Sequence, residues 1–161
     1  MINTIVEFGI NKIADNIGEV KIEKNKVCAE FIRSESDGLG GFELVEDKEN
    51  CNTLVVDLEL IIYNGKNISK NFNNIKLVFY CDSGKEKEYL IKNKSKKIVI
   101  AEKDVYENFS YINLKSKSIE ELKLETRIDS DLEELKNSKM FLQYYDVENN
   151  KVNKEFLKDL H

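Results

Sequence analysis

Apolar residues occupy every second position along much of the chain, which is the pattern of a β-strand with one face shielded from water. The clearest run lies between residues 53 and 63, where the alternating apolar side chains are Leu54, Val56, Leu58, Leu60 and Ile62. The same alternation predicts further strands at residues 20–22, 27–33, 42–46, 75–81, 86–91, 97–101, 105–114, 119–128, 139–146 and 152–158. Polar turns separate these segments at intervals of about 8 to 12 residues, which is typical of an antiparallel sandwich of two β-sheets.

The connections between the predicted strands are polar. The charged residues 23–26 predict a tight turn, so that residues 20–22 and 27–33 form a hairpin. Residues 34–41 (SESDGLGG) read as a flexible loop, and the asparagine-rich residues 64–74 read as a long connection. Four lysines follow one another at Lys92, Lys94, Lys96 and Lys97, and we expect a solvated loop there rather than an anion site.

Two helical segments are predicted. In residues 1–18 the apolar side chains recur at spacings of three and four, as on one face of an amphipathic helix, and Gly18 is placed like a C-cap. Near residues 131–136, Ser130 or Asp131 can cap a short helical turn, with Glu133 or Glu134 completing a capping box. We expect one domain over residues 1–161, in which the helix of residues 1–18 packs on a sandwich formed by residues 19–161.

Three of the predicted strands are apolar on both faces, at residues 60–63, 77–80 and 140–145. One face of a sandwich strand belongs to the core, and the other is normally polar because water meets it. A second apolar face therefore predicts a cover, supplied by the N-terminal helix, by a partner protein or by a second copy of the chain.

The charge of the chain narrows its possible partners. Its net charge is −5, and Arg33 and Arg127 are its only arginines. Nucleic-acid binding needs clustered cations against phosphates, so we expect no nucleic-acid partner. The sequence contains no apolar run of about 18 residues and nothing that resembles a secretion signal, so we expect no membrane insertion and a cytoplasmic location.

The residues with reactive side chains do not form a recognisable catalytic set. His161 is the only histidine and stands at the chain end, where we expect it to be frayed. Cys28, Cys51 and Cys81 are widely spaced, and we interpret them as small core residues, with a disulfide or a reactive thiol as the alternatives. We predict no catalytic, cofactor-binding or metal-binding residue, no cofactor and no small-molecule ligand.

From about residue 53 onward, three segments carry a resemblance to known proteins. They are LELIIYNGKNISKNFNNIKLVFY (58–80), INLKSKSIEELKLETRI (112–128) and ELKNSKMFLQYYDVENNKVNK (134–154). In this order the chain resembles a group of uncharacterised immunoglobulin-like β-sandwich proteins of low-GC Gram-positive bacteria. The resemblance implies an immunoglobulin-like fold and no particular activity.

The sequence favours a non-catalytic module that binds a protein partner or a second copy of itself. Aromatic side chains often anchor such interfaces, although they also fill cores. The candidate interaction residues are Tyr106, Phe109, Tyr111, Phe141 and Tyr145. Two alternatives stay open: a phage or mobile-element protein that inhibits a host factor by binding it, and a small hydrolase that uses carboxylate or cysteine chemistry.

Overall fold

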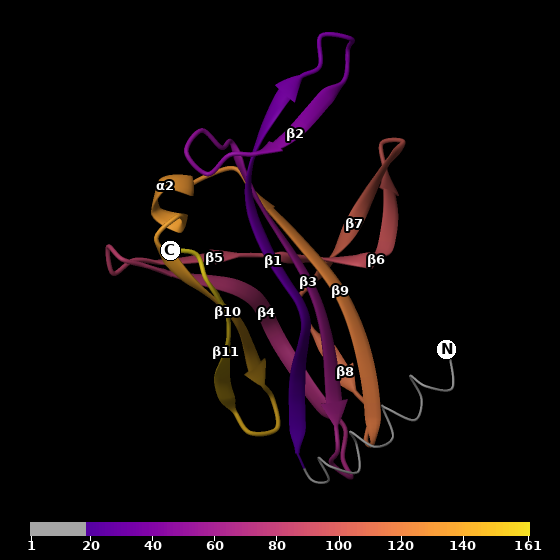
Figure 1. The fold of residues 1–161 in the computed structure, drawn as a ribbon. Helices are drawn as coiled ribbons and strands as arrows, with labels where there is room; N and C mark the ends of the chain where they lie inside the picture. The colour runs from indigo at the N-terminus through magenta and orange to yellow at the C-terminus, as the bar shows by residue number, and fades with distance from the viewer. Residues whose placement is uncertain (1–18) are drawn as a thin grey trace.

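The computed structural model describes residues 19–161, and the predicted N-terminal helix lies outside these described residues (Figure 1). The described part is mostly β-strand, arranged as two antiparallel sheets. The predicted two-sheet sandwich is therefore confirmed. One short helix, α2 (Leu132–Leu135), accompanies the strands near the end of β9 (Ser118–Ile128).

The larger sheet has six strands in the order β2-β1-β3-β9-β6-β7. Besides β9, these strands are β2 (Phe42–Glu46), β1 (Val20–Ser36), β3 (Thr53–Asn64), β6 (Ile91–Ile100) and β7 (Lys103–Phe109). Within it, β3 pairs with β1 on one side and with β9 on the other over almost its whole length. The strand with the clearest alternation in the sequence is thus an interior strand of the larger sheet.

The second sheet has five strands. Its main path runs β11-β10-β4-β5, and β8 pairs with the first residues of β4. These strands are β11 (Lys151–Asp159), β10 (Ser138–Asp146), β4 (Lys70–Cys81), β5 (Glu86–Tyr89) and β8 (Ile112–Leu114). β10 runs along one side of β4, and β5 and β8 both lie on the other side. Between β5 and β8, around Ile75, that second side of β4 has no paired strand among residues 19–161.

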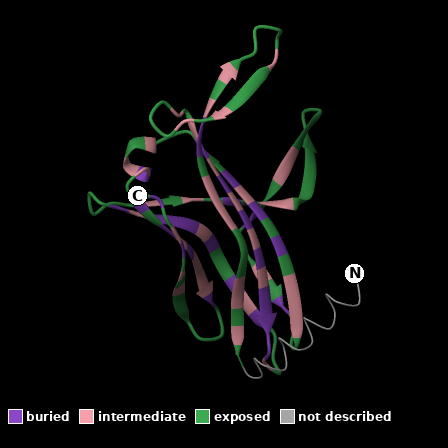
Figure 2. Ribbon diagram, in the orientation of Figure 1, coloured by how far each residue is buried: buried purple, intermediate pink, exposed green. Residues whose placement is uncertain are grey.

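The core lies between the two sheets and uses alternate residues of the central strands (Figure 2). As the sequence predicts, Leu54, Val56, Leu58, Leu60 and Ile62 of β3 are all buried. The facing residues of the smaller sheet include Ile75, Leu77 and Phe79 of β4 and Met140 and Leu142 of β10. Burial of these apolar side chains is the main term that stabilises the fold.

The predicted hairpin of residues 20–33 is wrong. Residues 20–36 form the single strand β1, which pairs with β3 on both sides of the charged segment. Lys24 lies opposite Leu60 and Lys26 lies opposite Glu59, so that Asn25 is an extra residue in β1. A β-bulge absorbs such a residue with a local bend and without reversing the chain.

Two predicted strands are each divided between the sheets. Residues 86–91 begin in the smaller sheet as β5 and enter the larger sheet as β6 after Leu90. Residues 105–114 cross back, with β7 in the larger sheet and β8 in the smaller one. The lysine cluster between Lys92 and Lys97 therefore lies in strand β6, which corrects the predicted loop.

The remaining corrections concern a loop and a helix cap. The connection predicted at residues 64–74 is shorter, because β4 already begins at Lys70. At its start the buried Asn64 holds the loop, its Nδ2 donating hydrogen bonds to the carbonyl oxygens of Ile68, Leu114 and Lys115. The N-cap of α2 is Asp131, but its side chain makes no capping hydrogen bond, so the predicted capping box is wrong.

Candidate functional site

The outer face of the five-stranded sheet carries a cluster of aromatic side chains. In β4, Leu77 and Phe79 point into the core, so Val78 and Tyr80 point outward. In β11, Leu157 is an extra residue relative to β10, and this bulge places Phe156 directly opposite Phe141. The bulge therefore brings two phenylalanines from neighbouring strands onto the same outer face.

The three rings of this cluster contact one another edge to face. The ring centroids of Tyr80 and Phe141 lie 5.2 Å apart, and those of Phe141 and Phe156 lie 5.5 Å apart. Val78, which is the neighbour of Phe141 across the β4–β10 register, is fully buried although it lies on the outer face. Phe156 remains 46% exposed, so the cluster still presents apolar surface to the solvent. We call Tyr80, Phe141 and Phe156 the outer aromatic patch.

Charged side chains surround the outer aromatic patch. The ammonium group of Lys154 lies 4.7 Å from the centroid of the Tyr80 ring and donates a hydrogen bond to the Tyr80 hydroxyl group. Lys154 also lies 3.9 Å from a carboxylate oxygen of Glu86. Further along the sheet, the Lys76 ammonium group is 2.5 Å from Glu88. An apolar centre with a polar rim of both signs is the usual anatomy of a protein–protein interface.

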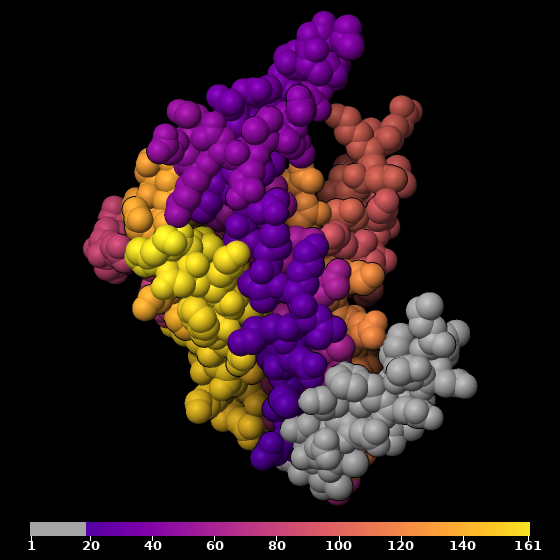
Figure 3. Space-filling view, viewed as in Figure 1, coloured from indigo at the N-terminus to yellow at the C-terminus, as the bar shows by residue number. Residues whose placement is uncertain are grey.

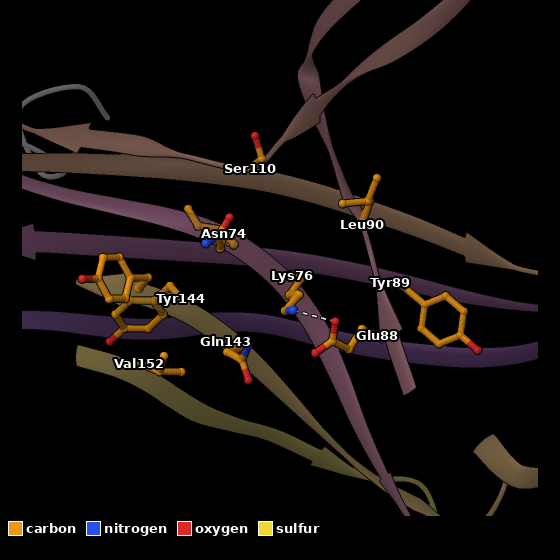
Figure 4. A pocket seen from close by; sticks show the side chains of 11 residues that line it. Asn74, Lys76, Glu88, Tyr89, Leu90, Ser110, Gln143, Tyr144 and Val152 are labelled. Atoms are coloured by element: carbon orange, nitrogen blue, oxygen red, sulfur yellow. Dashed lines mark hydrogen bonds and ion pairs between the residues drawn. The ribbon is translucent and has the colours of Figure 1, made fainter. Parts of the chain in front are cut away.

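A pocket of about 410 Å³ adjoins the patch on the same face (Figure 4). It opens beside the stretch of β4 that lies unpaired between β5 and β8, and it reaches Gln143, two residues beyond Phe141 along β10. Its lining residues are Asn74, Ile75, Lys76, Glu88, Tyr89, Leu90, Ser110, Gln143, Tyr144, Tyr145 and Val152. The lining surface is largely apolar, with two amide side chains, several hydroxyl groups and the Lys76–Glu88 ion pair among its residues. Such a pocket can receive a single large side chain.

Tyr144 and Tyr145 bound this pocket in different ways. The ring of Tyr144 lies 4.7 Å from that of Phe72, and burial raises the pKa of the Tyr144 hydroxyl group to about 12. Tyr145 stays half-buried, and its hydroxyl group donates a hydrogen bond to Asn150 in the β10–β11 turn. At neutral pH the Tyr144 hydroxyl group is therefore neutral and can donate a hydrogen bond.

The structure brings together only some of the candidate residues named from the sequence. Phe141 and Tyr145 lie on the outer face of the five-stranded sheet, as members of the patch and of the pocket. Tyr106 lies on the other sheet beside Lys97, whose ammonium group is 5.9 Å from the ring centroid. Phe109 is buried in the core, and Tyr111 is an isolated exposed residue.

Tyr80 and Phe156 were not among the candidate residues predicted from the sequence. For Tyr80 a signal was present, since residues 77–80 are apolar on both faces and Tyr80 belongs to the outer one. For Phe156 the sequence holds no such signal. Phe156 faces Phe141 only because of the bulge at Leu157, and alternation of apolar residues does not reveal that bulge. Bulges depend on the partner strand and leave little trace in a single sequence.

The groups that could support other chemistry lie apart. Cys28, Cys51 and Cys81 are free thiols; Cys81 is buried, and burial raises its pKa. His161 is held rather than frayed, since its Nε2 lies 2.8 Å from Asp82 and its Nδ1 contacts Asp159. Among residues 19–161, no group of three or more His, Cys, Asp or Glu residues is arranged to hold a metal ion.

In the part of the chain that the structure describes, no helix has the length and apolar character needed to cross a membrane.

Of three comparisons with known proteins, the one with protein families shows where the chain belongs. The model of a protein family described as the YopI Ig-like domain matches residues 18–158. No curated protein matches the chain. Among solved structures, an X-ray structure of a Northeast Structural Genomics Consortium target is similar, with 12% sequence identity and a TM-score of 0.41. That similarity covers 86% of this chain and 82% of the other.

Proposed function

Because the chain belongs to the YopI Ig-like domain family, we propose that it is a non-catalytic module that binds a partner protein on its outer aromatic patch. The observation that carries this proposal is the ring cluster of Tyr80, Phe141 and Phe156 on the outer face of a sheet whose other face already forms the core. Partly exposed aromatic rings at the centre of a surface are the usual anchors of protein interfaces.

The pocket beside the patch favours a protein partner with a protruding side chain rather than a partner that offers only a flat hydrophobic surface. An interface gains most of its free energy from a few side chains that fill pockets and lose contact with water. A volume of about 410 Å³ next to three aromatic rings in edge-to-face contact fits one bulky apolar side chain of the partner, with its neighbours lying across Phe141 and Phe156. Gln143 and Ser110 then offer hydrogen bonds to the partner's polar groups at the pocket edge.

A cytoplasmic setting is part of the proposal. The three unpaired thiols support it, because cysteines of secreted domains usually form disulfides whereas those in the reducing cytosol do not.

The proposal is tested by quantitative capture from a lysate of the native host. The baits are the wild-type chain, Phe156→Ser and Phe141→Ser, followed by affinity measurement with the captured partner. We expect each serine variant to weaken binding roughly thirtyfold or more, as is typical of a central aromatic residue worth about 2 kcal/mol.

The matched control is Tyr111→Ala, which removes an aromatic ring that is 69% exposed and lies outside the patch and the pocket lining. This variant should bind like the wild type. Chemical denaturation of all variants separates lost binding from lost folding. Equal affinity of the wild type and the two serine variants, or loss of binding with Tyr111→Ala alone, contradicts the proposal.

A further inference from the structure

Two β-hairpins extend beyond the body of the sandwich at the same end of the molecule (Figure 1). One joins the end of β1 to β2 and spans residues 32–46; the other joins β6 to β7 and spans residues 91–109. They stand at opposite edges of the six-stranded sheet, since β2 and β7 are its outermost strands. Figure 3 shows them as separate projections with open space between them.

Both hairpins expose large apolar side chains. On the β1–β2 hairpin these are Leu39, Phe42 and Leu44, which are 93%, 76% and 57% exposed. On the β6–β7 hairpin they are Ile98, Val99 and Ile100, which are 42%, 73% and 55% exposed. A two-stranded ribbon with no layer behind it is only marginally stable in water, so these side chains gain from a covering surface.

The charges of the two hairpins are opposite. Residues 32–46 contain one arginine and four acidic residues, for a net charge of −3, whereas residues 91–109 contain five lysines and three acidic residues, for a net charge of +2. Within the described part of the chain, the side chains of Glu43 and Glu46 in the first hairpin and of Lys96 and Lys103 in the second make no hydrogen bond or ion pair. The charges most available for a partner therefore have complementary signs.

A pocket at the base of the β6–β7 hairpin combines apolar groups with three cationic and two acidic side chains. It has a volume of about 400 Å³ and is lined by Lys92, Lys97, Asp104, Val105, Tyr106, Glu125 and Arg127. It lies where β6 contains three residues, 94–96, that have no partner in β7. Val105 and the ring of Tyr106 can contact an apolar side chain while Lys97 and Arg127 meet carboxylates beside it.

We propose that the chain self-associates through these hairpins, with the β1–β2 hairpin of one copy docking on the β6–β7 hairpin of a second copy. Leu39 and Phe42 enter the pocket of Val105 and Tyr106, and the acidic residues around them face the lysines. Because both hairpins project from the same end, a single two-fold axis forms this contact twice. The surface is distinct from the outer aromatic patch, so the inference goes beyond the proposed function.

Light scattering coupled to size-exclusion chromatography tests this inference across a range of protein concentrations. We expect a concentration-dependent dimer that dissociates more readily as NaCl rises from about 0.1 M to about 1 M, where the screening length falls from about 10 Å to about 3 Å. Lys96→Glu/Lys103→Glu and Glu43→Lys/Glu46→Lys should each weaken the dimer by about tenfold or more, because like charges then face each other.

The most decisive experiment mixes the two charge-reversed variants. In a mixed dimer both contacts again join an acidic hairpin to a basic one, so the mixture should dimerise like the wild type. Lys151→Glu, in the β10–β11 hairpin, and Phe156→Ser, in the outer aromatic patch, should leave the wild-type dimer unchanged.

Three results would overturn the inference: a monomer at every concentration, a dimer unaffected by either reversal, or a mixture that stays monomeric. Loss of the dimer with Phe156→Ser would also overturn it, since the second copy would then occupy the patch. The first three results leave capture of a partner protein by the patch untouched, so the two proposals fail separately.

Discussion

At the residue scale, the C-terminal His161 shows how a chain end can be fixed by electrostatics. Both ring nitrogens face carboxylates, Nδ1 toward Asp159 and Nε2 toward Asp82. A neutral imidazole can donate only one hydrogen bond, so the doubly protonated ring suits this position best. The hydrogen bonds to Asp159 and Asp82 raise the pKa of His161 above its ordinary value and lower the pKa of Asp159.

We predict that the imidazole proton resonances of His161 titrate with a midpoint above about 6.5, the value of an unperturbed histidine. Since the folded pKa is raised, the stabilisation by this contact is complete below about pH 6.5 and is lost as the pH rises through the folded pKa. Proton NMR is unambiguous because the chain has one histidine.

The matched variants for this titration are Asp82→Asn and Asp104→Asn. Asp82→Asn removes one carboxylate from the ring and should lower the pKa of His161. Asp104→Asn changes an exposed carboxylate on β7 and should leave the titration unchanged. A midpoint at or below that of an unperturbed histidine in the wild type would show that the C-terminus is not held in this way.

Individual core residues could be predicted well from the sequence, and individual surface roles could not. The burial of every second residue from Leu54 to Ile62 follows from alternation alone, because the side-chain period of a strand is two. Cys28 was expected in the core, yet it is half-buried and its thiol contacts Glu30. Exposed and buried aromatic residues look alike in a sequence. The buried Phe109 and the outward-facing Phe141 were therefore both predicted as interaction residues.

At the element scale, a buried ion pair ties the first residue of β4 to the last residue of β10. The ammonium group of Lys70 lies 2.7 Å from Asp146, and only 2% and 9% of the two side chains are exposed. Burial by itself would raise the pKa of Asp146, but the hydrogen bonds from Lys70 and Asn149 hold it below its ordinary value. The contact lies across the β4–β10 pairing that also positions Phe141 beside Tyr80.

We predict that Lys70→Met lowers the free energy of unfolding by about 3 to 5 kcal/mol, because it leaves a buried carboxylate without its cation. Lys70→Met/Asp146→Asn should recover part of this loss, since no buried charge then remains at Asp146. As the folded pKa of Asp146 is lowered, the wild-type contribution is present above about pH 3.9 and disappears as the pH falls through the folded pKa.

Urea denaturation measures these differences, and Lys76→Met is the matched control. Lys76 pairs with Glu88 at 2.5 Å, but the two side chains are 24% and 46% exposed. An exposed pair contributes at most about 1 kcal/mol. A Lys70→Met variant as stable as Lys76→Met would mean that the buried pair does not hold the strand ends together.

The elements whose bounds were predicted wrongly are those whose bounds depend on the strand that each one pairs with. Alternation located most strands but not the bulge at Asn25, because the charged residues 23–26 have the composition of a turn. The crossing from β5 to β6 at Leu90 leaves the alternation of neighbouring residues almost intact. The β6–β7 turn places Ala101 and Glu102 at φ values of 49° and 64°, where Asn-Gly would have been the expected signal.

At the scale of the whole molecule, the sandwich offers two separate surfaces. The outer aromatic patch lies on the five-stranded sheet, and the projecting hairpins extend from the edges of the six-stranded sheet. One surface is a flat ring cluster beside a pocket, and the other consists of two oppositely charged ribbons. Because the two surfaces are separate, the proposed partner binding and the proposed self-association do not compete for the same residues.

More of the architecture than of the site could be predicted from the sequence. Two antiparallel sheets follow from strand spacing, because each strand must bury one apolar face. The outer aromatic patch depends on one bulge in β11 and on the register of three strands. Such a register is specified by packing across the sheets and cannot be derived from one sequence.

The most direct test of the account is the footprint of a bound partner, mapped by amide hydrogen exchange on the chain with and without the partner captured from its host. The account predicts that added protection is concentrated in β4, β10 and β11, around Tyr80, Phe141 and Phe156. Protection confined to the strands of the six-stranded sheet, with β4, β10 and β11 unchanged, would contradict it.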